Sequence, residues 1–144
     1  MKWRPACAAD ASALAEVEQM QPLAAGWKES GFKTELAQPC ACIWCAEEAG
    51  KVIGFAAARF AADTAEILNV AVATSHMRLG VASQLLVQLL NDLKQRGVQQ
   101  VSLEVAQDNT PACALYKRSG FREINVRKNF YGPKRDAWIM GKKL

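Results

Sequence analysis

The chain has 144 residues, of which 51% are apolar, and carries a formal net charge of +4. This length is typical of one domain that buries its own core, so we expect a single domain over residues 1–144. No stretch approaches the ~20 uninterrupted apolar residues of a membrane span, and residues 1–11 lack the apolar core of a signal peptide, so we expect a cytoplasmic protein that does not bind a membrane. Because no basic–aromatic motif accompanies the positive charge, we do not expect a nucleic acid as partner.

The predicted elements follow one another without a linker, repeat or low-complexity segment. In chain order we expect a strand at 1–5, helices at 9–20 and 27–38, strands at 41–47, 51–60 and 66–73, a helix at 79–96, a strand at 98–105, a helix at 109–119, and strands at 121–131 and 136–142. Asp10 or Ser12 is the expected cap of the first helix, and Gly26 separates the first two helices. A strand, a helix and a strand in succession imply a parallel pair, whereas the hairpins on either side imply antiparallel neighbours. The predicted fold class is therefore α/β (α+β) with a mixed central sheet.

The helix expected at 79–96 has the clearest apolar pattern. Its apolar residues recur every three or four positions: Val81, Leu85, Leu86, Leu89, Leu90 and Leu93. This spacing places them on one stripe of the helix, which we expect to be buried, and Gly97 is the expected end of the helix.

The segment LNVAVATSHMRLGVAS, from Leu68 to Ser83, has the pattern of an anion-binding loop. A strand that leads through a glycine loop into a helix leaves backbone N–H groups unpaired at the positive end of the helix dipole. Two known phosphate loops do not fit, because Gly80 is followed by Val81 rather than by the Lys-Ser/Thr of a P-loop, and it supplies only one of the three glycines of G-x-G-x-x-G. Either the segment binds a group such as a pyrophosphate, or it is an ordinary strand-to-helix turn.

Two motifs resemble those of the GCN5-related N-acetyltransferases. Residues 77–82, MRLGVA, resemble the family's Q/R-x-x-G-x-G/A motif, which holds the pyrophosphate of acetyl-CoA, although Met77 departs from the usual Gln or Arg. Residues 103–121, LEVAQDNTPACALYKRSGF, resemble the family's second signature, L-x-V-x-x-x-N-x-x-A-x-x-L-Y-x-x-x-G-F. Together with RKNFY at 127–131 and DAWIM at 136–140, they look like the family's bacterial ribosomal-protein-alanine branch. Phe130 stands where that branch often has a tyrosine.

The resemblance implies the family's fold, with about seven strands and about four helices, and acetyl-CoA as co-substrate with no metal. It assigns acetyl-CoA binding to the strand, loop and helix around Gly80 and to the start of the next helix. Those residues are Val70, Ala71, Val72, Arg78, Leu79, Gly80, Val81, Ala82, Ser83 and Asn109. Backbone N–H groups of the first three would hold the thioester carbonyl. Asn109 also has a structural explanation, since it precedes Thr110-Pro111 as a helix N-cap would.

Glu104 and Tyr116 are the candidate catalytic residues. Val101, Leu103 and Val105 share one strand face, so Glu104 points to the other, where it is either salt-bridged for structure or faces a solvated cleft as a proton acceptor. The resemblance assigns Glu104 the role of general base and Tyr116 that of general acid toward the departing CoA thiolate. A tyrosine packed in the core is the alternative for Tyr116.

The expected acceptor is a protein N-terminus, by resemblance the N-terminal alanine of a small-subunit ribosomal protein. Trp27, Glu29 and Tyr131 are candidates for the acceptor cleft, and each also fits as a core or surface residue. Residues 1–72 have a net charge of −3 and residues 73–144 one of +7, which would attract a cationic peptide to one side and the phosphates of acetyl-CoA to the other. The alternatives are a relaxed N-terminal or lysine acetyltransferase, a small-molecule amine acetyltransferase, and a non-catalytic acetyl-CoA-binding module. We expect a monomer or weak dimer.

Five cysteines, an odd number without an export signal, predict reduced thiols. Cys40, Cys42 and Cys45 are close in sequence, but a strand places Cys42 and Cys45 on opposite faces and no fourth ligand lies nearby. We therefore expect small buried side chains rather than a zinc site. His76 is the single histidine and belongs to the loop, so Cys113 has little support as a nucleophile.

Overall fold

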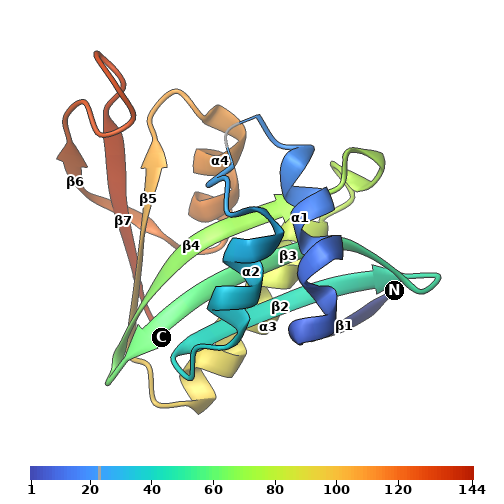
Figure 1. Ribbon diagram of the computed structural model, residues 1–144. Coiled ribbons are helices and arrows are strands. Elements are labelled where there is room, and N and C mark those ends of the chain that lie inside the picture. The colour runs from blue at the N-terminus through green and yellow to red at the C-terminus, as the bar shows by residue number, and fades with distance from the viewer. Residues whose placement is uncertain (23) are drawn as a thin grey trace.

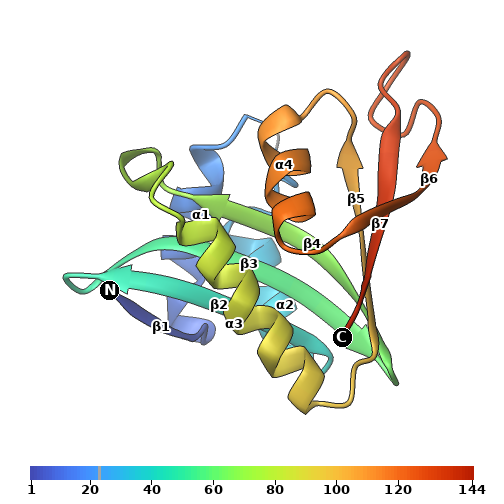
Figure 2. The same cartoon turned by 180° about the vertical axis from the view of Figure 1, so that it is seen from behind.

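A mixed sheet with helices on both faces forms the protein (Figure 1, Figure 2). The computed structural model describes residues 1–22 and 24–144, and these residues form seven strands in the order β1-β2-β3-β4-β5-β7-β6. The strands are β1 (Lys2–Pro5), β2 (Ala41–Glu48), β3 (Lys51–Ala61), β4 (Thr64–Val72), β5 (Gln100–Ala106), β6 (Arg122–Arg127) and β7 (Ala137–Lys143). The β4–β5 pair is parallel and the other five pairs of this sheet are antiparallel. The predicted mixed sheet is confirmed.

The helices divide between the two faces of the sheet. Figure 1 shows α1 (Ala11–Gln19) and α2 (Lys28–Leu36) over one face, and Figure 2 shows α3 (Val81–Gln95) and α4 (Thr110–Arg118) over the other. Short 3₁₀ turns occupy Ala8–Asp10 and Thr74–His76. Across the described chain, every helix is too short or too polar to cross a membrane.

Alternation along the central strands supplies a separate core to each helix layer. On β2, Ile43 and Cys45 pack with the α1 and α2 layer, whereas Cys42 and Ala46 pack with the α3 layer. In the first layer, the ring of Phe32 meets that of Phe55 edge to face at a centroid distance of 5.2 Å. Successive side chains of a strand point to opposite faces of the sheet, and each face here is covered by helices. The sheet is therefore apolar on both faces.

The apolar stripe of α3 is buried as its spacing predicts. Leu85, Leu86, Leu89 and Leu93 are each 0% exposed and lie against β2, β3 and β4. Full burial of one such side chain contributes roughly 1.5–3 kcal/mol, so this helix is fixed firmly to the sheet. Its first turn, which begins the functional region described below, is fixed with it.

The parallel pair β4–β5 is short, and the two strands then separate. Pairing extends over four residues of each strand, from Thr64 opposite Gln100 to Ile67 opposite Leu103. A β-bulge follows in β4, where the register with β3 passes over Leu68. Beyond it β4 stays paired with β3, while β5 stays paired with β7. Among the described strands, none therefore pairs with the N–H and C=O groups of residues 69–72 that point away from β3.

Several predicted boundaries move by a few residues for identifiable reasons. The helix expected at 79–96 begins at Val81, because Gly80 is left-handed with φ +78°. Asp10 stands at the N-cap of α1 without making a capping bond to it. Instead its carboxylate accepts two hydrogen bonds from Arg4, at 2.8 and 2.9 Å, and one from the Cys7 N–H. The strand expected at 121–131 ends at Arg127, and the following turn contains Asn129 at φ +56°.

The cysteines are free thiols whose burial differs. Cys42 and Cys45 lie on opposite faces of β2, as predicted, and burial raises the pKa of Cys42 to about 12 and that of Cys45 to about 11. Cys113 is also buried, whereas Cys40 is partly exposed, so the prediction of a buried side chain is wrong for Cys40. It lies one residue before β2, at the end of the strand rather than within it.

Candidate active site

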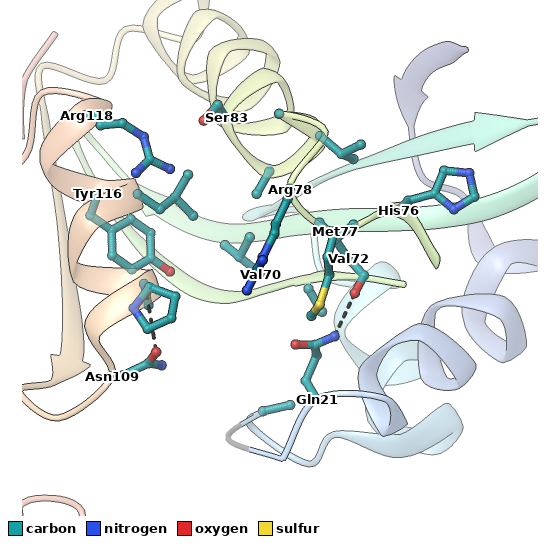
Figure 3. Close-up of a pocket in the computed structure, with 18 of the residues that line it drawn as sticks. Gln21, Val70, Val72, His76, Met77, Arg78, Ser83, Asn109, Tyr116 and Arg118 are labelled. Atoms are coloured by element: carbon teal, nitrogen blue, oxygen red, sulfur yellow. Dashed lines mark hydrogen bonds between the residues drawn. The ribbon is translucent and has the colours of Figure 1, made fainter. Parts of the chain in front are cut away.

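A pocket of about 630 Å³ opens where β4 and β5 separate. One wall is the end of β4, the second is the loop 73–80 with the first turn of α3, and the third is α4 (Figure 3). The lining residues are Gln21, Pro22, Ala24, Val70, Ala71, Val72, His76, Met77, Arg78, Gly80, Val81, Ala82, Ser83, Asp108, Asn109, Pro111, Ala112, Leu115, Tyr116 and Arg118. Segments from both halves of the chain thus meet around one cavity.

The loop before α3 has the conformation of an anion site. Arg78 and Gly80 both adopt left-handed backbone angles, with φ +63° and φ +78°. The first internal hydrogen bond of the helix runs from the Gln84 N–H to the Gly80 carbonyl, so the N–H groups of residues 81–83 have no helical acceptor. They lie at the positive end of a 15-residue helix dipole, and Arg78 adds a full positive charge beside them. This arrangement favours a phosphate or pyrophosphate.

The opposite wall is the pocket-facing side of α4. Asn109 caps this helix, as the sequence predicts, by accepting the Ala112 N–H on Oδ1 at 3.4 Å. Tyr116 lies two turns further along the same side (Figure 3), with its ring edge to face against Phe121 at 5.9 Å. Burial raises the pKa of Tyr116 well above its ordinary value, with smaller contributions from Tyr131 and Cys113. The phenol therefore stays protonated at neutral pH and can act as a donor into the pocket.

Glu104 lies on β5 outside the residues that line the pocket. Its side chain is 19% exposed, and one carboxylate oxygen pairs with Nη1 of Arg127 at the end of β6. The guanidinium of Arg127 also stacks on the Phe130 ring at 4.5 Å, and the Tyr131 hydroxyl donates to the Glu104 carbonyl at 3.2 Å. Glu104 is therefore both salt-bridged and in contact with solvent, which combines the two alternatives that the sequence left open.

A second ion pair, in which the arginine also lies near an aromatic ring, involves the loop between β6 and β7. Arg135 donates to both carboxylate oxygens of Asp108, at 2.9 and 3.0 Å, and lies 5.8 Å from the Tyr131 ring centroid. These hydrogen bonds keep the pKa of Asp108 below its ordinary value. Since Asp108 lines the pocket, the loop at 128–136 is connected to the pocket wall.

A family model describes most of this chain. The model of the acetyltransferase (GNAT) family matches residues 11–121, a segment that includes all three walls of the pocket. The chain belongs to the acetyltransferase (GNAT) family. The resemblance that the two motifs indicate is confirmed.

The relatives of this GNAT chain include enzymes named for ribosomal proteins. It is 39% identical over 97 residues to the [ribosomal protein bS18]-alanine N-acetyltransferase of Haemophilus ducreyi, covering 65% of this chain and 67% of that protein. It is 38% identical over 94 residues to the enzyme of the same name from Escherichia coli K12, covering 63% and 64%. The matched segments thus span about two thirds of these relatives. The crystal structure of the ribosomal-protein-S18-alanine N-acetyltransferase from Escherichia coli superimposes with a TM-score of 0.88 at 30% identity over 99% of this chain and 92% of that one.

The positions of the predicted acetyl-CoA residues suit a GNAT pocket. Nine of the ten line it, and Leu79 does not. The Leu79 side chain is 68% exposed, so its assignment rests on its backbone alone. Of the acceptor candidates, Tyr131 reaches Glu104, whereas Trp27 packs on Phe32 at 5.3 Å and Glu29 pairs with Lys33 on the surface.

A buried polar cluster beside the pocket is absent from the sequence-based predictions. Glu18, only 2% exposed, accepts hydrogen bonds from the Trp27 and Lys28 N–H groups, both at 3.0 Å, and from Asn69 Nδ2 at 2.7 Å. Gln21 then donates to the Val72 carbonyl at 2.6 Å (Figure 3). The cluster joins the segment between α1 and α2 to β4. A carboxylate four residues after Leu14 and three after Ala15, inside the apolar stripe of α1, is the sequence signal that marks it.

Proposed function

We propose that this protein transfers the acetyl group of acetyl-CoA to the α-amine of an N-terminal alanine, that of ribosomal protein S18. The observation that carries the proposal is the pocket at the separation of β4 and β5, which presents a phosphate loop at one end and Tyr116 at its side. The similarity to two enzymes named for S18 alanine supports the choice of acceptor.

The pocket provides a place for each part of acetyl-CoA. The unpaired N–H groups at the start of α3, together with Arg78, suit the pyrophosphate. The edge of β4 at residues 69–72 that faces away from β3 offers backbone N–H and C=O groups to the amides of the pantetheine arm, although the Val72 carbonyl already accepts from Gln21. The N–H groups around Val70 would hold the thioester carbonyl and stabilise the oxyanion that develops on it.

In the proposed reaction the neutral amine attacks the thioester carbonyl directly. The new C–N bond forms as the C–S bond breaks, the nitrogen loses one proton and the thiolate of CoA gains one. An α-amine with a pKa near 8 is about one tenth neutral at pH 7, so one carboxylate, acting directly or through a water, is a sufficient base. Glu104 is that base in the proposal, and Tyr116 donates to the thiolate from its protonated state.

Release of CoA from acetyl-CoA tests the proposal. The acceptor is a peptide with the N-terminal segment of S18, compared with the same peptide whose α-amine is blocked and whose lysines are free. We expect turnover with the free α-amine alone, reduced roughly 100-fold or more in Glu104→Gln. Glu66→Gln, an exposed carboxylate on β4 that makes no ion pair in the described chain, is the matched control and should retain activity.

The other outcomes separate the alternatives. Turnover on lysines would indicate a relaxed acetyltransferase. Acetyl-CoA binding without turnover on either peptide would contradict the assignment and favour a small-molecule acceptor or a module that only binds the co-substrate. Equal activity of Glu104→Gln and the wild type would refute only the role of Glu104 as the base and would leave the proposed reaction standing.

A further inference from the structure

Two arginines at the pocket have no side-chain partner in the described part of the chain. The chain has eight arginines, and five of them form ion pairs with carboxylates: Arg4, Arg59, Arg96, Arg127 and Arg135. Within residues 1–22 and 24–144, Arg78, Arg118 and Arg122 make neither an ion pair nor a side-chain hydrogen bond. Two of these three, Arg78 and Arg118, line the pocket. Unpaired cations therefore gather where an anionic ligand is expected.

The last turn of α4 shows this difference between adjacent residues. Lys117 pairs with Glu123 at 2.7 Å, whereas Arg118 beside it has no carboxylate partner in the described chain. Figure 3 shows Arg118 at the α3 side of the pocket, extending from α4 toward the helix that carries Ser83. An arginine that only stabilised the negative C-terminal end of the α4 dipole would not have to extend toward α3.

A second cavity continues from that point. It has a volume of about 410 Å³, lies between α3, the end of α4 and the end of β7, and shares Ser83 and Arg118 with the first pocket. Its remaining lining residues are Leu86, Val87, Leu90, Asn91, Lys94, Ser119, Lys142, Lys143 and Leu144. Four of the lining side chains are cationic and none of those described is an aspartate or glutamate. The Lys142 ammonium is held in place by donating to the Ser119 carbonyl at 2.7 Å.

The co-substrate carries two separate anionic groups. Acetyl-CoA carries a pyrophosphate and, on its ribose, a 3′-phosphate. The start of α3 and Arg78 account for one of these groups and leave the second cavity, whose cations pair with no carboxylate side chain in the described chain, for the other. We propose that the second cavity receives the 3′-phosphate and that Arg118, at the junction, is the residue by which this enzyme distinguishes CoA from 3′-dephospho-CoA.

This inference rests on the proposed use of acetyl-CoA but not on the identity of the acceptor. A guanidinium can donate two parallel hydrogen bonds to one phosphate, which an ammonium cannot do with the same geometry. Arg118 can therefore select the 3′-phosphate while the lysines around it contribute attraction that is less directional.

The test is calorimetric titration of CoA and of 3′-dephospho-CoA into the wild type, Arg118→Gln and Arg122→Gln. Arg122 is the third unpaired arginine and lines neither cavity, so it is a matched control for loss of one positive charge. We expect the wild type to bind CoA at least roughly tenfold more tightly than 3′-dephospho-CoA, the equivalent of one charge-assisted hydrogen bond. This preference should fall about tenfold in Arg118→Gln and remain in Arg122→Gln.

Three results would overturn the inference. The first is equal affinity of the wild type for the two ligands. The second is an equal loss of affinity for both ligands in Arg118→Gln, which would assign this arginine to the pyrophosphate. The third is the same change of preference in Arg122→Gln, which would indicate a general charge effect. Absence of binding of either ligand would instead contradict the proposed function, so the two failures are distinguishable.

Discussion

Replacement of Glu18 tests whether the buried cluster beside the pocket stabilises the fold as its geometry indicates. The carboxylate accepts three hydrogen bonds and is almost fully buried. A hydrogen bond to a charged acceptor contributes about 1.5–3 kcal/mol, but the Trp27 and Lys28 N–H groups lie at the solvent-accessible start of α2 and can be rehydrated. The main loss is at Asn69, which is 5% exposed and would keep an unpaired amide donor. We therefore expect Glu18→Ala to lower the free energy of unfolding by about 3–4 kcal/mol, including a small cavity.

Glu18→Gln should cost less, because it preserves the shape and one acceptor oxygen. That oxygen can replace Oε2, which receives both the Trp27 N–H and the Asn69 amide, so the bond from Lys28 is the one lost. We expect about 1.5 kcal/mol. Glu16→Ala, an exposed position on the same helix, should change stability by less than about 0.5 kcal/mol.

Urea denaturation followed by tryptophan fluorescence measures these differences, with equal slopes as the check on two-state behaviour. A loss in Glu18→Ala no larger than in Glu16→Ala would refute the reasoning. So would a Glu18→Gln variant less stable than Glu18→Ala, because burial of the uncharged amide would then cost more than its hydrogen bonds contribute.

Three further predictions concern acid stability, the phosphate loop and the core. The Arg4 guanidinium holds the pKa of Asp10 at about 2, below its ordinary 3.8. The contribution of the Asp10 carboxylate to the free energy of unfolding is therefore complete above about pH 4 and is lost as the pH falls toward 2. Over this range, urea denaturation should show a stability loss about 2 kcal/mol larger in the wild type than in Asp10→Asn. In Gly80→Ala the added methyl group meets no atom within 4 Å, but an alanine is strained at φ +78°. We expect this variant to lose about 1 kcal/mol of stability and to bind acetyl-CoA more weakly in a titration. Gly97→Ala, equally open at φ +90°, should lose the same stability and leave binding unchanged. Leu89→Ala, at 0% exposure, should lose about 3 kcal/mol by urea denaturation, against little for Val87→Ala at 47%, and equal losses would argue against the buried stripe.

The elements of the fold could be predicted because their signals are local. The stripe from Val81 to Leu93 has the period of a helix, the run around Val70 has strand composition, and Gly80 marks the turn between them. Asn109 followed by Thr110 and Pro111 likewise predicts a helix start, which the structure confirms.

The parts that could not be predicted depend on contacts distant in sequence. Nothing near Leu68 indicates that β4 will leave β5 at that residue, because the bulge is defined by pairing with β3. The pairing of Glu104 with Arg127 and the position of Arg118 between two cavities depend on how β6 and α4 pack. The catalytic roles of Glu104 and Tyr116 stay predictions, since geometry places them without measuring proton transfer.

The short β4–β5 pairing has a consequence for the order in which the molecule assembles. Strands β2, β3 and β4 are consecutive and are joined by two-residue turns, so their contacts are local and can form early. β5 joins β4 through only four residue pairs and only after 27 intervening residues have formed a crossover helix, which makes it a slower event. Because the pocket has β4 on one side of this junction and α4 on the other, recovery of ligand binding during refolding should coincide with the slowest kinetic phase rather than with the first appearance of secondary structure.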